Sequence, residues 1–374
     1  MRTSSKLLRE LGFKRILNAG GHYTIMRGSC LEARVLQAMD EAADYWIDMR
    51  KLELNAGKML SSYLECEDGL VTSGAYAANA MAAETSFAIA EEKNHALSDP
   101  EIIIQSSHIT EYAQSFTTSG IRIKQITRQS ENESLRKHVT ESTIALVYVI
   151  NETELEFSIQ ETIDVGTNSG LPVIVDAAVV DPPIRGIREV LRYEPGIVTV
   201  SGGKGFNGPN GTGILLGKKK MISKARDIAF PNYGPGRGMK VSKEEIVGLM
   251  MAVSIAASTD EEAMIQDWKT RIELIRNSVL GLPNIRTEVL YPWRLNFPQP
   301  VPRLVIWIDR EDGKERAARI RNALLESSPS VFTRPLDQIS GPKNRLLIDP
   351  RVLGKRDAKK VGDNIRLQLK RFLS

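Results

Sequence analysis

One lysine of this chain stands where an amine nucleophile could act. Lys204 follows the β-branched run 197–200 and Ser201–Gly203, and a second glycine-rich segment separates it from the apolar run 214–216. This pattern predicts a lysine just beyond a buried strand, on a backbone with few side chains to cover it. A partly desolvated ammonium group loses proton affinity, and the neutral amine can form a Schiff base with pyridoxal phosphate (PLP). The alternative is a surface turn with a solubilising lysine.

Two further chemical groups close buried strands. The apolar run 171–175 ends on Asp176, and a carboxylate in that position is costly unless it has a partner. A protonated pyridine nitrogen would be such a partner. His108 follows the strand-like run 101–105, and the carboxyl ends of strands are where ligands bind in α/β sheets. The alternative for His108 is a structural hydrogen bond.

A fourth strand end has the features of an anion site. The short strand-like run 69–72 turns through Ser73, Gly74 and Ala75 into an alanine-rich helical stretch. The free N–H groups and the dipole of a helix N-terminus favour a phosphate there. The alternative is an ordinary serine N-cap with no ligand.

Strand and helix patterns alternate from about residue 65 to 217, which is typical of a mainly parallel sheet covered on both faces. Residues 31–63 read as helical, with Gly57 leaving either one kinked helix or two. Beyond residue 240 a capping box at Ser242 opens a long helix, and mixed helices and strands follow. We expect an N-terminal segment, 1–30, that joins the small domain, a large domain at 31–245, and a bridging helix with a smaller α+β domain at 246–374.

The composition is ordinary for a globular enzyme. Of 374 residues, 42% are apolar and 26% charged, and the net charge of +4 is too small and dispersed to favour nucleic acid as a partner. The two cysteines, Cys30 and Cys66, have no CxxC spacing, so neither a disulfide framework nor a metal site is predicted. Because no run approaches about 18 apolar residues, we expect no membrane span and no signal peptide, and a cytoplasmic location.

The chain resembles fold-type I PLP-dependent enzymes related to bacterial selenocysteine synthase (L-seryl-tRNA(Sec) selenium transferase). Within that family it is most similar to the shorter D-glucosaminate-6-phosphate ammonia-lyase branch. The absence of the extra N-terminal domain expected of the selenium transferase argues against a tRNA-based reaction. The segments that carry the resemblance are 18–24, 71–75, 175–178, 201–205, 208–213 and, most distinctive, 236–245.

The resemblance implies a fold, a cofactor and a set of roles. It implies the PLP-dependent transferase fold, with a mainly parallel seven-stranded sheet in the large domain and a smaller α+β C-terminal domain. Lys204 would form the Schiff base, Asp176 would pair with the pyridine N–H, and His108 and Ala178 would lie on the two faces of the ring. The other implied cofactor contacts are Ser73, Gly74, Ala75, Ser201, Gly211 and Thr212. In this fold a second subunit completes the site, so the resemblance implies a homodimer or higher homo-oligomer with sites at the subunit interface. The loop of Gly211 and Thr212 would then approach the neighbouring subunit's cofactor.

The predicted reaction is that of a PLP-dependent lyase. Its substrate would be an amino acid or amino sugar acid, with or without a phosphate group. Removal of the α-proton and β-elimination would give a 2-keto acid and ammonia. The alternatives are a PLP-dependent transferase, aminotransferase or racemase, and a non-catalytic protein with the PLP-enzyme fold. The candidates for the substrate's carboxylate or phosphate are Arg27, Arg237, Lys240 and Arg334.

Overall fold

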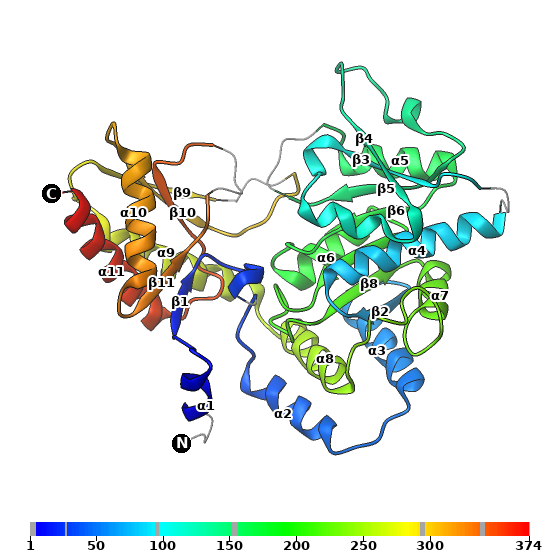
Figure 1. Cartoon of the computed structure of the whole chain (residues 1–374), viewed down its shortest axis with the longest axis horizontal. Helices are drawn as coiled ribbons and strands as arrows, with labels where there is room; N and C mark the ends of the chain where they lie inside the picture. The colour runs from blue at the N-terminus through cyan, green and yellow to red at the C-terminus, as the bar shows by residue number, and fades with distance from the viewer. Residues whose placement is uncertain are drawn as a thin grey trace. The chain divides into compact units, whose positions relative to one another are not determined.

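The computed structural model describes residues 5–26, 28–93, 97–151, 156–291, 296–336 and 341–373. It divides into two compact units (Figure 1). Unit 1 comprises Met1–Met26, Asp260–Arg294 and Pro300–Ser374, and unit 2 comprises Arg27–Thr259 and Leu295–Gln299. The domain boundaries expected after residues 30 and 245 remain a prediction, and the two units are a separate, contact-based division of the chain.

Unit 2 is built on a seven-stranded sheet. Its strands, in chain order, are β2 (Asp68–Thr72), β3 (Glu101–Gln105), β4 (Arg122–Ile126), β5 (Thr143–Val149), β6 (Val173–Asp176), β7 (Ile197–Ser201) and β8 (Gly213–Gly217). Their order in the sheet is β2-β8-β7-β6-β5-β3-β4. All neighbouring pairs are parallel except those of β8, which is antiparallel to both β2 and β7. The predicted mainly parallel, seven-stranded sheet is confirmed.

Helices cover both faces of this sheet, so its strands are apolar on both sides. On β8, Leu215 packs in one core with α4 (Ala75–Lys93) and α7 (Lys219–Ile228), whereas Ile214 and Leu216 face the other core. That second core includes side chains of α3 (Met49–Leu64), α5 (Ile159–Ser169), α6 (Pro183–Leu191) and α8 (Lys243–Ala257). Figure 1 shows these helices on either side of the strands.

The helical stretch 31–63 forms two helices, and Gly57 does not separate them. The helix α2 (Ala33–Ala43) ends well before α3, whose N-cap Asp48 accepts hydrogen bonds from the N–H groups of residues 50 and 51. Gly57 lies within α3, where an added Cβ would be 2.4 Å from the carbonyl oxygen of Gly69. The glycine is therefore needed for close helix-strand packing, and the cap at Asp48 starts the second helix. The capping box predicted at Ser242 opens α8.

Short 3-10 helices connect several of these elements. They are η1 (Thr24–Met26) in unit 1 and η2 (Ser106–His108), η3 (Glu111–Phe116), η4 (Thr118–Gly120) and η5 (Leu135–His138) in unit 2.

Unit 1 is a smaller α+β assembly. Its three-stranded antiparallel sheet has the order β12-β10-β9, and β1 pairs in parallel with β11. The strands are β1 (Ile16–Ala19), β9 (Ile285–Leu290), β10 (Arg303–Ile308), β11 (Ser330–Thr333) and β12 (Arg345–Ile348), and the helices are α1 (Ser5–Glu10), α9 (Glu261–Val279), α10 (Gly313–Glu326) and α11 (Lys355–Leu373). The core joins side chains of α9, α10 and α11 to those of β10 and β12.

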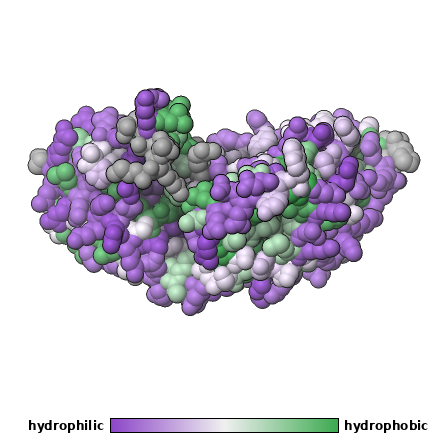
Figure 2. All heavy atoms as spheres, turned by 90° about the horizontal axis from the view of Figure 1, so that it is seen from below, coloured by the Kyte–Doolittle hydropathy of each residue, from purple (hydrophilic) through white to green (hydrophobic). Residues whose placement is uncertain are grey.

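Hydrophilic side chains cover most of the face shown in Figure 2. Within the described ranges, no helix combines the length and the apolar character that a membrane crossing requires.

Candidate functional site

Several of the site residues predicted from the sequence lie at the carboxyl edge of the large sheet. Asp176, the last residue of β6, pairs with Val149 on β5 and with Thr199 on β7. Two residues further along β7, Ser201 pairs with Gly213, the first residue of β8. Neighbouring strands are about 4.8 Å apart, so these strand ends form one continuous row.

The row continues from Gly213 to Thr72 at the end of β2. Ser73 and Gly74 follow as a turn, and α4 begins at Ala75. Gly74 has a φ of +94°, which favours glycine. An added Cβ on Gly213 would lie 2.4 Å from the carbonyl carbon and oxygen of Gly74. The start of β8 therefore packs directly against this turn. The first N–H groups of α4 have no partner inside the helix.

Asp176 is buried, with 8% of its surface exposed. Its Oδ1 accepts a hydrogen bond of 3.0 Å from the backbone N–H of Ala178, and its Oδ2 accepts one of 2.8 Å from Asn79 Nδ2. Each carboxylate oxygen can accept a further hydrogen bond. Asn79, on α4, was not predicted from the sequence. A neutral amide in an alanine-rich helix does not by itself indicate a role in a site. The one available clue is the helix periodicity, which places Asn79 one turn after Ala75.

Lys204 lies in the turn beyond β7 and is partly exposed. Its carbonyl oxygen accepts a hydrogen bond from the N–H of Asn207. The backbone before it is crowded, since Ser29 Oγ donates a 3.1 Å hydrogen bond to the carbonyl oxygen of Gly203. An added Cβ on Gly28, whose φ is +69°, would lie 2.3 Å from that same oxygen. The turn that carries Lys204 is therefore held by the segment beginning at Gly28.

His108 is completely buried at the end of η2. Its Nδ1 accepts a 3.0 Å hydrogen bond from the N–H of Val149, the β5 residue beside Asp176, and its Nε2 is 2.8 Å from Asn296 Nδ2. Its ring meets the ring of Tyr148 edge-on, with centroids 4.6 Å apart. Burial lowers the pKa of His108 to about 3. The imidazole is therefore neutral at physiological pH.

The predicted cofactor contacts in the loop before β8 differ in exposure. Gly211 is exposed, whereas Thr212 is completely buried. Thr212 Oγ1 donates a 2.6 Å hydrogen bond to the carbonyl oxygen of Pro209. An added Cβ on Gly202 would lie 2.2 Å from the same hydroxyl. Thr212 thus packs the loop against the turn that carries Lys204, and its cofactor role stays a prediction.

Two of the four candidate anion ligands lie in the segment between α7 and α8. Arg237 is half-buried, and its guanidinium lies 5.0 Å from the ring centroid of Phe230 and 5.1 Å from that of Tyr233. Its Nη1 is buried without a hydrogen-bond partner among the residues that the structure describes. Lys240 is exposed.

The other two candidates are outside this group. Arg27 lies outside the described residues. Arg334 belongs to unit 1, where its Nη1 is 3.8 Å from Asp349 Oδ2 and its guanidinium lies 5.5 Å from the ring centroid of Tyr23.

The residues at the sheet edge fit PLP. The glycine turn and helix start after β2 fit a phosphate, the buried Asp176 fits a pyridine N–H, and Lys204 supplies an amine from the neighbouring strand end. These three features lie along one row of a single sheet, although they are far apart in the sequence.

Comparison with known proteins points in the same direction. No family model matches the chain. It is 27% identical over 363 residues to 5'-C-glycyluridine monooxygenase-decarboxylase from a Streptomyces species, which covers 92% of this chain and 87% of the relative. It is 28% identical over 262 residues to D-glucosaminate-6-phosphate ammonia lyase from Salmonella typhimurium, which covers 66% of this chain and 69% of the relative.

Solved structures extend the likeness to the whole fold. A structure of D-glucosaminate-6-phosphate ammonia-lyase matches with a TM-score of 0.75 at 22% identity, covering 98% of this chain and 99% of that one. A structure of SPT with PLP matches with a TM-score of 0.64 at 14% identity, covering 95% and 87%. The chain is therefore similar in sequence to D-glucosaminate-6-phosphate ammonia lyase and has the fold of the fold-type I PLP-dependent enzymes, which confirms the predicted resemblance and fold.

Proposed function

We propose that this chain is a PLP-dependent lyase that converts an amino acid or amino sugar acid into a 2-keto acid and ammonia. The observation that carries the proposal is Asp176, a buried carboxyl group that closes a central strand and has one donor on each oxygen. A buried carboxylate held in this way is suited to a cationic ring nitrogen. The similarity to an ammonia lyase supports the reaction class.

The residues of the site divide the work of binding and proton transfer. The N-terminus of α4 binds the phosphate group, and Asp176 orients the ring and holds the proton on its nitrogen. When bound, PLP supplies an electron sink for the negative charge that develops at the substrate's α-carbon. Lys204 Nζ accepts the α-proton and then supplies a proton to the β-hydroxyl group, which leaves as water. Hydrolysis of the released enamine yields the keto acid and ammonia.

Among the candidate substrate ligands, Arg237 has the best support. Its buried Nη1 has no partner in the described part of the chain, and a guanidinium binds a carboxylate or phosphate with two parallel hydrogen bonds. The rings of Phe230 and Tyr233 lie within cation–π distance of its guanidinium group. We assign Arg237 to the substrate's anionic group and keep Lys240, Arg27 and Arg334 as further candidates.

A second candidate function has its own support. The relative that covers more of this chain is a monooxygenase-decarboxylase, and its name describes a glycyl-bearing nucleoside as its substrate. The same site would then cleave the bond from the α-carbon to the carboxylate and use molecular oxygen. The experiment that separates the two is a screen of amino acids, amino sugar acids and nucleosides that carry a carbon-linked glycyl group with a free carboxylate. Ammonia and keto-acid release without oxygen uptake supports the lyase, whereas carbon dioxide release with oxygen uptake supports the second candidate.

The cofactor assignment is tested at Lys204. We expect purified protein mixed with PLP to show a visible absorbance band, because a covalent link to an amine shifts the absorbance of PLP. The Lys204→Ala variant should lack this band, and Lys220→Ala, which changes an exposed lysine on α7, should retain it. Absence of the band from the wild-type protein would rule out the proposal.

We also propose that the protein acts as a homodimer or a larger homo-oligomer in the cytoplasm. Two large aromatic side chains of unit 2 are almost fully exposed: Trp46, between α2 and α3, and Tyr233, between α7 and α8. Exposed aromatic side chains are enriched at protein interfaces. Light scattering from the purified protein tests the oligomeric state, and a monomer at micromolar concentration would contradict this proposal.

A further inference from the structure

The buried carboxylate at the sheet edge accepts a hydrogen bond from Asn79, which in turn accepts one from Thr199. We propose that Asn79 and Thr199 are positioning residues for Asp176, which keep its carboxylate in one orientation for the ring nitrogen of the cofactor. This inference rests on the proposed function, since the proposed function gives Asp176 its ring-binding role. It adds two residues that neither the sequence patterns nor the resemblance indicated.

The contacts form a chain of two hydrogen bonds across the sheet and one helix. Thr199 Oγ1, on β7, donates a 2.6 Å hydrogen bond to Asn79 Oδ1. Asn79 Nδ2, on α4, donates a 2.8 Å hydrogen bond to Asp176 Oδ2, on β6. An ionised carboxylate only accepts hydrogen bonds, so the amide must present its NH₂ group to Asp176. Its carbonyl then faces Thr199, and the hydroxyl of Thr199 fixes the amide in this orientation.

The chain sets the rotation of the Asp176 carboxyl group. The N–H of Ala178 holds Oδ1 and Asn79 holds Oδ2, so rotation of the carboxyl group about its bond to Cβ would break both hydrogen bonds. Each oxygen keeps the capacity for one more hydrogen bond, which a ring N–H would use. Thr199 and Asn79 are 0% and 1% exposed, so water does not compete with these contacts.

The position of Asn79 on α4 gives the arrangement a structural logic. Asn79 lies four residues after Ala75, on the same face of the helix and one turn further in. The helix α4 therefore presents its N-terminus to the phosphate of the cofactor. One turn later, the same helix presents the amide of Asn79 to Asp176, which binds the ring nitrogen. Within 75–83, a fully described stretch, Asn79 is the one buried side chain that is polar. A buried amide is costly unless it is paired, and here both of its ends are paired.

The alternative is that the two side chains only satisfy each other within the core. Single variants separate a stability effect from an effect on the cofactor. We expect Asn79→Leu to weaken the binding of PLP about tenfold or more, the change that follows from the loss of one buried hydrogen bond to a charged group. Thr199→Val removes the hydroxyl that fixes the Asn79 amide, so it should weaken the binding of PLP in the same direction. The visible band of bound PLP should also titrate at higher pH. With less positive charge on the pyridine ring, the nitrogen that links PLP to Lys204 holds its proton more tightly. Thr199→Ser keeps the hydroxyl and should restore both properties.

A double variant distinguishes the two interpretations. Asn79→Leu/Thr199→Val removes both ends of the hydrogen bond, so no unpaired hydroxyl remains buried and thermal stability should recover relative to Asn79→Leu. PLP affinity and the pH of the band should remain changed, because Asp176 still lacks its donor. Thr85→Val is the matched control: it removes a buried hydroxyl that hydrogen-bonds to the carbonyl of Met81 on the same helix, and it should leave the band unchanged.

Each outcome is decisive. Wild-type affinity and band titration in Asn79→Leu would overturn the inference, and so would their recovery in the double variant. A wild-type protein that binds no PLP would instead overturn the proposed function, and this result is recognised before any variant is made.

Discussion

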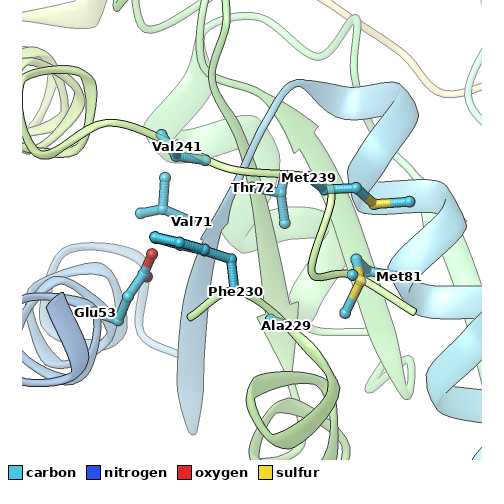
Figure 3. A pocket seen from close by; sticks show the side chains of 9 residues that line it. Glu53, Val71, Thr72, Met81, Ala229, Phe230, Met239 and Val241 are labelled. Atoms are coloured by element: carbon cyan, nitrogen blue, oxygen red, sulfur yellow. The ribbon is translucent and has the colours of Figure 1, made fainter. Parts of the chain in front are cut away.

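Glu53 is a buried carboxyl group with no role in the proposed site. It lies on α3 with 3% of its surface exposed, and its Oε2 has no hydrogen-bond partner among the described residues. It borders a small pocket, and Figure 3 shows its carboxyl group pointing toward Val71 and Phe230. Burial raises the pKa of Glu53 to about 7, against the opposing effects of Arg226 and of the N–H of Val71. The protonated form is therefore favoured below neutral pH.

This shift predicts a pH-dependent stability that is absent from Glu53→Gln. The folded chain holds the Glu53 proton between about pH 4.5 and 7, where the unfolded chain has lost it, so unfolding releases a proton. The free energy of unfolding should therefore fall as pH rises through this window, by up to about 3 kcal/mol. Urea denaturation of the two proteins from pH 5 to 8 measures the difference in slope. The control is Glu41→Gln, an exposed position on α2, and equal slopes in wild type and Glu53→Gln would contradict the prediction.

The residues that carry charge or nucleophilic character were the predictable part of the site. Lys204, Asp176 and His108 each follow an apolar run, and the alternation of strands and helices places such positions at one edge of a parallel sheet. Asn79 could not be predicted in this way. Its proposed role depends on Thr199, 120 positions away in the sequence, and on the rotation of α4 over the sheet. Neither is encoded in a local pattern.

At the level of elements, the start of β8 determines the shape of the turn between β2 and α4. Gly213 pairs with Thr72 and Ser201, and its Cα faces the peptide of Gly74. The sequence predicted a glycine-rich loop here, but not that β8 lies between β2 and β7. The position of a strand within a sheet is set by contacts between distant segments, whereas its existence follows from its own apolar run.

Gly213→Ala tests this arrangement. The added Cβ would lie 2.4 Å from backbone atoms of Gly74 and 2.7 Å from Thr72 Oγ1, so the turn must shift. We expect a loss of about 1–3 kcal/mol of stability and a weaker affinity for PLP, because the N–H groups at the start of α4 move with the turn. Fluorescence titration with PLP and with inorganic phosphate measures the effect on the anion site.

The control for this substitution is Gly238→Ala. Nothing lies within 4 Å of a Cβ added at Gly238, so this variant should bind both ligands as the wild type does. If Gly213→Ala also kept wild-type affinity for both, the start of β8 would have no part in shaping the anion site.

At the scale of the whole molecule, the assigned chemistry is concentrated in one compact unit. The residues proposed to bind the cofactor all belong to unit 2, whereas Arg334 belongs to unit 1. There, the fully buried Asp349 has three guanidinium groups around it, with Nη2 of Arg303 at 3.0 Å, Nη2 of Arg351 at 2.7 Å and Nη1 of Arg334 at 3.8 Å. Burial alone would raise the pKa of Asp349, but these arginines together hold it well below its ordinary range.

Asp349→Asn should therefore destabilise unit 1 while leaving the cofactor site intact. The substitution leaves the guanidinium groups without their shared counter-charge, and breaking a buried ion pair costs about 3–5 kcal/mol. The lowered pKa means that Asp349 stabilises the fold above its unfolded pKa of 3.8 and that this contribution is lost as pH falls, so the difference between variant and wild type should shrink in acid. Calorimetry from pH 3 to 7 measures this trend.

The control is Asp357→Asn, a partly exposed position on α11. It should differ little in stability from wild type, because surface ion pairs contribute little. Below the variant's unfolding temperature the visible band of bound PLP should be that of the wild type, and its loss would show that the cofactor site depends on unit 1.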